Sequence, residues 1–107
     1  MKYIDFEITI HDLSHNGVCY IDFNNGEYIV NALSVMTKYQ NKGIGAFLIK
    51  SAEEFISNLK GSKAILYVEK DTWQAEWYKR LGYHESNIQD DVDGFIRMEK
   101  ELKTEES

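Results

Sequence analysis

The sequence predicts an α/β sandwich with a mixed sheet, built from elements in the order βββαβαββ. Three observations predict this fold class. Apolar and polar residues alternate through residues 3–10, which is the pattern of a half-buried strand. Apolar residues recur at helical spacing through residues 44–59. The short apolar run 64–68 that follows has the length of a central strand.

The first part of the chain has the pattern of an antiparallel meander. Polar residues and a glycine at 11–17 predict a turn after the first strand, and a second strand is expected over 18–23. Asn24-Asn25-Gly26 is a hairpin signal, because asparagine and glycine tolerate positive φ. A third strand is therefore expected from about Glu27 to Met36.

Two helices and two short strands complete the prediction. The helix over 44–59 carries its charged residues on the side away from its apolar stripe, and Gly61 is expected to end it. Asp71-Thr72-Trp73-Gln74 has the form of a capping box with Asp71 as N-cap. A second helix should follow it and end at Gly82. The last two strands are expected at 83–85 and 95–98.

Composition limits the classes of protein to which the chain can belong. The 107 residues, 43% of them hydrophobic, suit one globular domain over 1–102 with a flexible tail at 103–107. The net charge of -6 argues against a nucleic-acid surface, which needs a basic face. No apolar run approaches the length of a transmembrane helix, and the N-terminus lacks a signal-peptide core. The expected location is therefore the cytoplasm, with no membrane partner.

Cys19 is the only cysteine, so an intrachain disulfide is excluded. It lies in an alternating apolar run, and we interpret it as a small buried hydrophobic residue. A catalytic thiol is the alternative, but no pattern of cysteine with histidine surrounds it. We expect no metal site.

The segment Gln40-Asn41-Lys42-Gly43-Ile44-Gly45 joins the third strand to the first helix. A helix N-terminus offers unpaired N–H groups and partial positive charge, and glycines let a ligand approach the backbone. With Lys38 and Lys42 nearby, the segment predicts a pyrophosphate cradle. A P-loop does not fit because Lys42 precedes the glycines, and a Rossmann turn would need a glycine at Leu48. The alternative is an ordinary strand-to-helix connection.

These residues resemble the GNAT superfamily of acyl-CoA-dependent N-acetyltransferases. That family's pyrophosphate motif is Gln/Arg-x-x-Gly-x-Gly/Ala after a strand, which Gln40-Asn41-Lys42-Gly43-Ile44-Gly45 matches. Its second signature is a strand, then Asn-x-x-Ala, then Tyr-x-x-x-Gly-Phe. Here Leu66-Tyr67-Val68 is followed by Asp71, by Ala75 one position later than the signature has its alanine, and by Tyr78-Lys79-Arg80-Leu81-Gly82-Tyr83. The two matches occur in the right order, and the resemblance covers roughly residues 18–100.

The resemblance implies acetyl-CoA as the co-substrate and an amine as the acceptor. The amides of residues 41–46 would hold the pyrophosphate. The strand edge at 33–35 would pair with the pantetheine arm, and a β-bulge near it would aim an amide at the thioester carbonyl. Tyr78 would protonate the departing thiolate, although a core aromatic is the alternative interpretation of that residue. The implied cofactor-binding residues are Leu33, Ser34, Val35, Gln40, Asn41, Lys42, Gly43, Ile44, Gly45, Ala46, Asp71 and Tyr78.

The resemblance also implies a mostly antiparallel sheet, from which this chain departs in two ways. Only residues 11–17 stand between the first two strands, so the family's usual first two helices, which cover the acceptor site, are lacking. The acceptor cleft should therefore be open, which fits a protein lysine or a large amine. Asp71 stands where the family has asparagine and would put a charge near an anion; a plain N-cap is the alternative.

The acceptor amine must lose a proton, because a lysine-like amine has a pKa near 10.4. Family members often use a glutamate on the strand before the pyrophosphate turn, and here that strand offers Glu27 at its start. Glu69, at the end of the next predicted strand, is the other candidate base. Both residues are open to a plainer interpretation as exposed carboxylates at strand ends. His84 and His15 are weaker candidates.

The sequence leaves open the kind of acceptor, whether the chain is catalytic, and its oligomeric state. The acidic loop Asp90-Asp91-Val92-Asp93-Gly94 is either a solvated loop or an attraction for a cationic acceptor. With the short length, it also resembles phage-borne acetyltransferases that silence CRISPR nucleases by modifying a lysine. The alternative class is a non-catalytic module that binds acyl-CoA or a protein, such as a phage-type inhibitor of a host defence protein. Monomer and homodimer are both compatible with exposed sheet edges.

Overall fold

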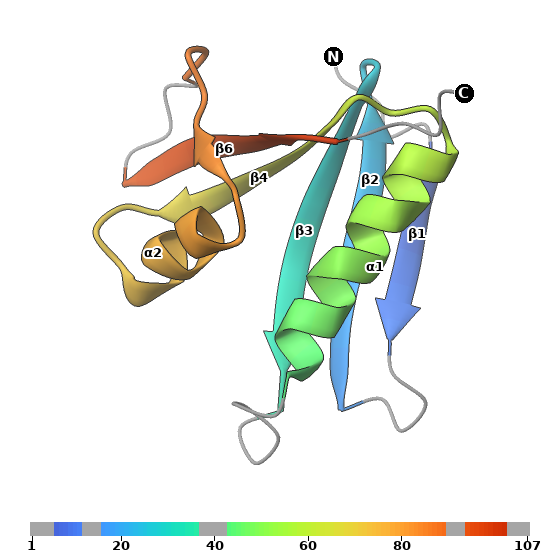
Figure 1. Ribbon diagram of the computed structural model, residues 1–107, viewed down its shortest axis with the longest axis horizontal. Coiled ribbons are helices and arrows are strands. Elements are labelled where there is room, and N and C mark those ends of the chain that lie inside the picture. Colours follow the sequence, from blue (N-terminus) through green and yellow to red (C-terminus); the bar gives the residue numbers. More distant parts are fainter. Residues whose placement is uncertain (1–5, 12–15, 37–42, 90–93, 103–107) are drawn as a thin grey trace.

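The chain folds in the predicted order βββαβαββ, in a computed structural model that describes residues 6–11, 16–36, 43–89 and 94–102 (Figure 1). Its strands form one sheet in the spatial order β1-β2-β3-β4-β6-β5. The elements are β1 (Phe6–His11), β2 (Gly17–Asn24), β3 (Glu27–Val35), α1 (Ile44–Asn58), β4 (Lys63–Glu69), α2 (Trp73–Arg80), β5 (His84–Glu85) and β6 (Phe95–Glu101).

The first three strands form the predicted antiparallel meander. The turn between β2 and β3 places Asn25 at φ 55° and Gly26 at φ 79°. Two consecutive residues at positive φ match the right-handed twist of a hairpin, and asparagine and glycine adopt them at little cost. The prediction of a hairpin at this position is confirmed.

The connection from β3 through α1 to β4 makes the one parallel pair among the described strands. β3 and β4 are paired at a single position, Ile29 with Ile65, after which β3 runs on to Val35 and β4 to Glu69. Figure 1 shows the two strands diverging from that point. β4 then pairs antiparallel with β6 along its whole length. The mixed, mostly antiparallel sheet that the sequence predicts is therefore confirmed, with a gap between β3 and β4.

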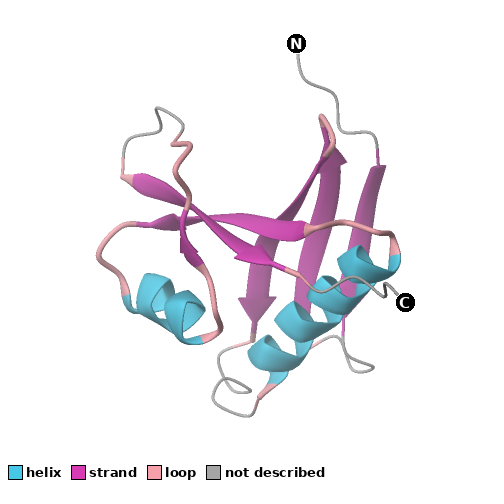
Figure 2. Ribbon diagram, turned by 45° about the horizontal axis from the view of Figure 1, so that its top comes forward, coloured by secondary structure: helices cyan, strands magenta, loops and turns pink. Residues whose placement is uncertain are grey.

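Both helices lie on the same face of the sheet (Figure 2). α1 buries Leu48, Ile49, Ala52 and Ile56 against the sheet. Fully burying an aliphatic side chain of this size stabilises the fold by about 1.5–3 kcal/mol. Alternate residues of β4, namely Ala64, Leu66 and Val68, pack into the same core as these helical residues. The predicted apolar stripe is confirmed only in part, because two of its members, Phe47 and Leu59, are exposed. Among the described residues, no helix covers the opposite face of the sheet.

The end of α1 differs from the prediction. Its last residue is Asn58, and Lys60, not Gly61, adopts positive φ (71°) after the helix. Gly61 is instead required by packing, because a Cβ there would lie 2.5 Å from Cγ2 of Ile56 and 2.9 Å from the Tyr28 ring. At the end of α2 the glycine rule holds: Gly82 has φ 103°, and its N–H donates to the carbonyl of Lys79.

The start of α2 is a second correction. The N-cap is Thr72, not Asp71: the Thr72 hydroxyl accepts a hydrogen bond from the N–H of Ala75. The same hydroxyl donates to the carbonyl of Glu69 at 2.8 Å, which fixes the turn after β4. Asp71 precedes the cap, is exposed and has φ 58°. A threonine three residues before Ala75 satisfies the first orphan amides as well as an aspartate would.

Candidate functional site

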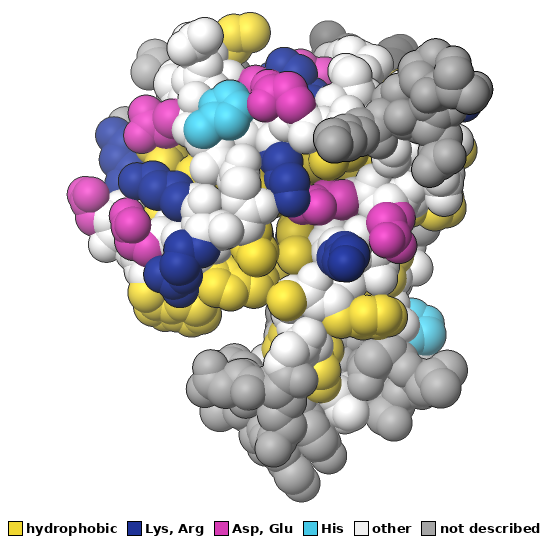
Figure 3. All heavy atoms as spheres, viewed as in Figure 1, with side chains coloured by type: hydrophobic (Ala, Val, Ile, Leu, Met, Phe, Trp, Pro, Cys, Tyr) yellow, Lys and Arg dark blue, Asp and Glu magenta, His cyan; other side chains and the backbone are white. Residues whose placement is uncertain are grey.

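A cleft of about 370 Å³ opens where β3 and β4 separate. The end of β3, the first turn of α1 and one side of α2 form its walls. Figure 3 shows the surface hollowed between these elements, with hydrophobic side chains gathered on the α2 side. The lining residues are Leu33, Ser34, Val35, Gly43, Gly45, Ala46, Trp73, Gln74, Trp77 and Tyr78.

The β3 wall begins at a β-bulge. Val18 pairs with Ser34 and Tyr20 pairs with Asn31, so residues 32 and 33 of β3 both lie opposite Cys19. Two residues facing one define a bulge, which bends the strand and re-aims its groups. The bulge that the sequence analysis expects near 33–35 is present in the β2–β3 pairing, in the part of β3 that lies beyond its pairing with β4 at Ile29.

The first turn of α1 is arranged to receive an anion. Its N-cap, Gly43, has φ 84° and provides no side-chain cap, and no acidic residue occupies the first turn. The N–H groups of residues 44–46 lack carbonyl partners within the helix, and the helix dipole adds partial positive charge. A phosphate at this position would therefore meet several donors at once. The Ile44 side chain turns away and packs where a Cβ on Gly17 would lie, at 2.8 Å.

Tyr78 brings a phenol to the α2 wall. Its ring lies 5.1 Å from the Trp77 ring and 5.7 Å from the Tyr83 ring, centroid to centroid. Burial, with a smaller electrostatic contribution from Cys19, raises the pKa of Tyr78 to about 12. The hydroxyl is therefore protonated throughout the physiological range and can act as a hydrogen-bond donor inside the cleft.

Three cleft residues were not identified from the sequence: Trp73, Gln74 and Trp77. They face the cleft together with Tyr78 because positions i, i+1, i+4 and i+5 share one side of a helix. Trp77 also packs against α1, with its ring 3.5 Å from where a Cβ on Gly45 would lie. The helical spacing of the two tryptophans was the available signal, and the sequence analysis drew no inference from it.

The predicted cofactor-binding residues fall into three groups. Seven of them line the cleft: Leu33, Ser34, Val35, Gly43, Gly45, Ala46 and Tyr78. Two do not line it: the Ile44 side chain packs beneath, and Asp71 is exposed in the turn before α2. The remaining three, Gln40, Asn41 and Lys42, lie outside the described residues, as do 90–93 of the acidic loop.

Glu27, a predicted base, does not reach the cleft. It lies at the start of β3, eight residues from Val35, which corresponds to about 26 Å of extended strand. Its carboxylate holds the Arg97 guanidinium through two bonds, at 3.0 and 3.4 Å. The structure therefore places Glu27 in a charged cluster on the sheet face opposite α1 and gives no geometry for a catalytic base.

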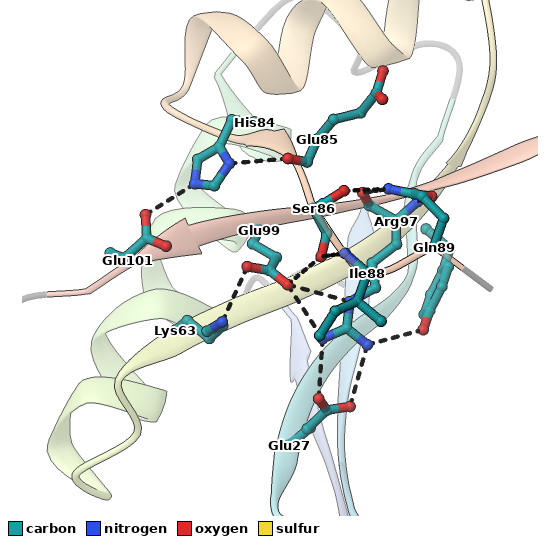
Figure 4. Close-up of polar contacts among 11 residues, drawn as sticks. Glu27, Lys63, His84, Glu85, Ser86, Ile88, Gln89, Arg97, Glu99 and Glu101 are labelled. Atoms are coloured by element: carbon teal, nitrogen blue, oxygen red, sulfur yellow. Dashed lines mark hydrogen bonds and ion pairs between the residues drawn. The ribbon is translucent and has the colours of Figure 1, made fainter.

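That cluster is built around Arg97 and Glu99, which are both buried (Figure 4). Glu99 accepts hydrogen bonds from the Ser86 hydroxyl at 2.6 Å and from the Lys63 ammonium at 3.0 Å. Arg97 joins it at 3.2 Å and is held in turn by Glu27. The Ser86 hydroxyl, followed by the Lys63 and Arg97 charges, lowers the pKa of Glu99 to about 2 against the cost of burial. The cluster ties β3, β4, β6 and the residue that follows β5 together on the sheet face opposite α1.

Glu69, the other predicted base, lies at the cleft end of β4. Its side chain is exposed and does not line the cleft, although its carbonyl anchors the N-cap of α2. The other candidate groups lie outside the cleft. His84 pairs with Glu101 at 2.9 Å on the surface. Burial of Cys19 raises the pKa of its thiol to about 11, so that thiol is unreactive. Within the described residues, no three acidic, histidine or cysteine side chains gather as metal ligands, and neither helix could cross a membrane.

Comparison with known proteins identifies the family to which this fold belongs. The family model for the acetyltransferase (GNAT) domain matches residues 4–102. The PaiA N-acetyltransferase from Thermoplasma acidophilum, solved in complex with coenzyme A, superposes with a TM-score of 0.76 at 18% identity, over 90% of this chain and 61% of that chain. A sequence search among curated proteins finds no match.

Two further solved structures share the fold. The ribosomal-protein-S18-alanine N-acetyltransferase from Escherichia coli superposes with a TM-score of 0.75 at 16% identity, over 96% of this chain and 74% of that chain. An acetyltransferase of the GNAT family from Staphylococcus aureus superposes with a TM-score of 0.69 at 15% identity, over 87% and 65%. At these identities the likeness concerns the fold alone.

Proposed function

Because the chain belongs to the GNAT acetyltransferase family, we propose that it is an N-acetyltransferase that moves the acetyl group of acetyl-CoA to a primary amine. One observation carries the proposal. The bulged edge of β3, the uncapped first turn of α1 and the Tyr78 hydroxyl meet in a single cleft. Each supplies one requirement of thioester chemistry: backbone groups for an extended arm, amides for a pyrophosphate, and a proton donor for a thiolate.

The reaction follows from these positions. The pyrophosphate binds at the amides of residues 44–46, and the pantetheine arm pairs with β3 at 33–35. The bulge aims a backbone N–H at the thioester carbonyl oxygen, where charge develops in the transition state. A base takes one proton from the acceptor ammonium, and the neutral nitrogen forms the new C–N bond as the C–S bond breaks. Tyr78 gives its proton to the departing sulfur and is reprotonated by the second proton that the nitrogen releases.

The acceptor enters from the sheet face opposite α1. The cofactor occupies the helical side of the gap between β3 and β4, so the other side is left for the amine. None of the described helices covers that face, and the net charge of the chain is -6. An open approach on a chain of acidic net charge fits a cationic acceptor such as a protein lysine or a large amine. We assign Glu69 as the base, reached through water, because it lies at the cleft end of β4.

Calorimetric titration with acetyl-CoA tests the cofactor site. Gly43→Glu puts a carboxylate where the pyrophosphate binds and should abolish micromolar binding by the native protein. Gly26→Glu is the matched control, because Gly26 also has positive φ and open space around it but lies in the β2–β3 hairpin. Both variants carry the same strain and charge. Equal loss in both, or no binding by the native protein, would show that the first turn of α1 is not the site.

Substitution of Tyr78 tests catalysis. Tyr78→Phe should lower the acetyl-transfer rate about 100-fold, since a positioned proton donor contributes 10²–10⁴-fold, while the affinity for acetyl-CoA is kept. Tyr28→Phe, at the far end of β3, is the control and should not change the rate. Glu69→Gln should remove the acidic limb of the pH–rate profile, and a retained limb would reject Glu69 as the base.

A second function is favoured by one observation. No carboxylate or histidine belongs to the described residues that line the cleft. A protein that binds acyl-CoA, or a partner protein, without catalysis needs none. Such a module would keep its affinity for acetyl-CoA and show no transfer to any amine, with or without Tyr78.

A further inference from the structure

Trp73 is an unusual residue to find at the rim of a cleft. It lines the cleft, yet 68% of its surface is exposed, more than that of any other large apolar side chain in the described ranges. A tryptophan can bury 150–250 Å², so leaving it open forgoes a large part of its hydrophobic stabilisation. Because the ring also lines the cleft, it is available to the aromatic part of a ligand that binds there.

The cleft-facing residues of α2 form a gradient of depth. Tyr78 and Trp77 are half-buried, and Trp77 packs beside Gly45 in the first turn of α1. Trp73 lies one helical turn before Trp77 on the same side, so its ring is the next surface toward solvent. The half-buried rings of Trp77 and Tyr78 therefore lie inside the cleft, and the exposed Trp73 indole lies at its rim.

We propose that Trp73 is a stacking platform for the adenine base of the acyl-CoA co-substrate, an inference that rests on the proposed function. Acyl-CoA extends from its thioester through a flexible arm and a pyrophosphate to a ribose that carries a flat aromatic base. With the pyrophosphate at the amides beside Trp77, the base lies one sugar further out, where Trp73 is exposed.

The aromatic ring of Trp73 favours the adenine base over the other parts of acyl-CoA. The pantetheine arm is thin and non-aromatic, and it runs along the β3 edge, on the other wall. The adenine base has a broad π-face, and stacking of a base on an aromatic side chain contributes about 1–3 kcal/mol. That corresponds to roughly 5- to 150-fold in affinity. Trp73 therefore distinguishes acyl-CoA from acyl carriers that present the same arm without a nucleotide.

Two ligands and one matched variant test the platform. Trp73→Ala should raise the Kd for coenzyme A by about 5- to 150-fold. The same variant should leave the Kd for 4′-phosphopantetheine, which has the arm but no adenine, within about twofold of the native value. Phe47→Ala is the control: Phe47 is an exposed aromatic on the first turns of α1, but it does not line the cleft, so neither Kd should change.

Fluorescence gives a second, independent measurement. Trp73 and Trp77 are the only tryptophans, so Trp77→Phe leaves Trp73 as the sole indole. Stacking predicts that coenzyme A quenches its emission and that 4′-phosphopantetheine does not. Equal weakening of both ligands by Trp73→Ala, an unchanged affinity for coenzyme A, or unquenched emission with bound coenzyme A would each overturn the inference while leaving the proposed function intact. Failure of the native protein to bind coenzyme A would overturn both.

Discussion

The buried Glu99 carboxylate should make the stability of the protein depend on pH in the acid range. Its pKa is about 2 in the folded protein against 4.5 for the free group, and only 7% of its side chain is exposed. The folded-state pKa is lowered, so the stabilisation is complete above the unfolded value and is lost as pH falls through the folded value. The difference corresponds to on the order of 3 kcal/mol, of which roughly 2 kcal/mol is lost by pH 3.

Urea unfolding of the native protein and of Glu99→Gln at pH 6, 4 and 3 isolates this contribution. All other carboxylates titrate in both proteins, so the difference between the two unfolding free energies should shrink by about 2 kcal/mol between pH 6 and pH 3. Glu76→Gln is the control: Glu76 pairs with Lys79 at 3.3 Å but is 64% exposed, so its difference should stay near zero. A difference for Glu99→Gln that does not vary with pH would refute the assignment.

Three further substitutions test the corrected details of the fold. Gly61→Ala should destabilise the protein by about 1–3 kcal/mol in urea unfolding, because the new Cβ overlaps Ile56; unchanged stability would contradict the packing role. Thr72→Ala should cost about 1 kcal/mol by the same assay, while Asp71→Gly, which removes the carboxylate and tolerates the positive φ, does not; the reverse result would return the cap to Asp71. Glu27→Gln should lower stability by roughly 1–2 kcal/mol, discounted for a side chain that is 40% exposed, and leave the pH–rate profile unchanged; a lost acidic limb would make Glu27 a base after all.

The element order could be predicted because periodicity is a local property of the chain. Alternation over the first strands and helical spacing over 44–59 require no knowledge of the partner surface. The ends of the helices and strands were harder to predict, because several residues near each end have a suitable residue type. Tertiary packing decides which of them ends the element. Gly61 has the composition of a helix stop, but Ile56 and Tyr28 leave no room for a side chain there, and Lys60 takes the left-handed position instead.

Charge pairing lay beyond prediction for a different reason. Glu27 and Arg97 are 70 residues apart, and nothing in either local pattern indicates that β3 and β6 lie close enough for the two side chains to meet. Without the guanidinium, Glu27 is an unassigned carboxylate on the strand where a base is expected. The position of α2 could not be predicted either, because Trp77 becomes a cleft residue only where it packs beside Gly45 of α1.

The proposed cofactor half of the site can be predicted from the sequence, because backbone groups form it. The proposed acceptor half cannot be predicted in this way, because it depends on particular side chains. A strand edge and an uncapped helix start need only glycine and the order of elements, which motifs record. Proton movement needs particular groups in particular places. Tyr78, with a pKa of about 12, is a weaker acid than a thiol of pKa about 8.5, so it cannot hold the charge if it gives its proton to sulfur. In the proposed reaction, the proton that Tyr78 gives to the sulfur is therefore replaced by one from the amine. This links the acid and base steps through the acceptor, so the proposed reaction depends on the chemistry of the amine.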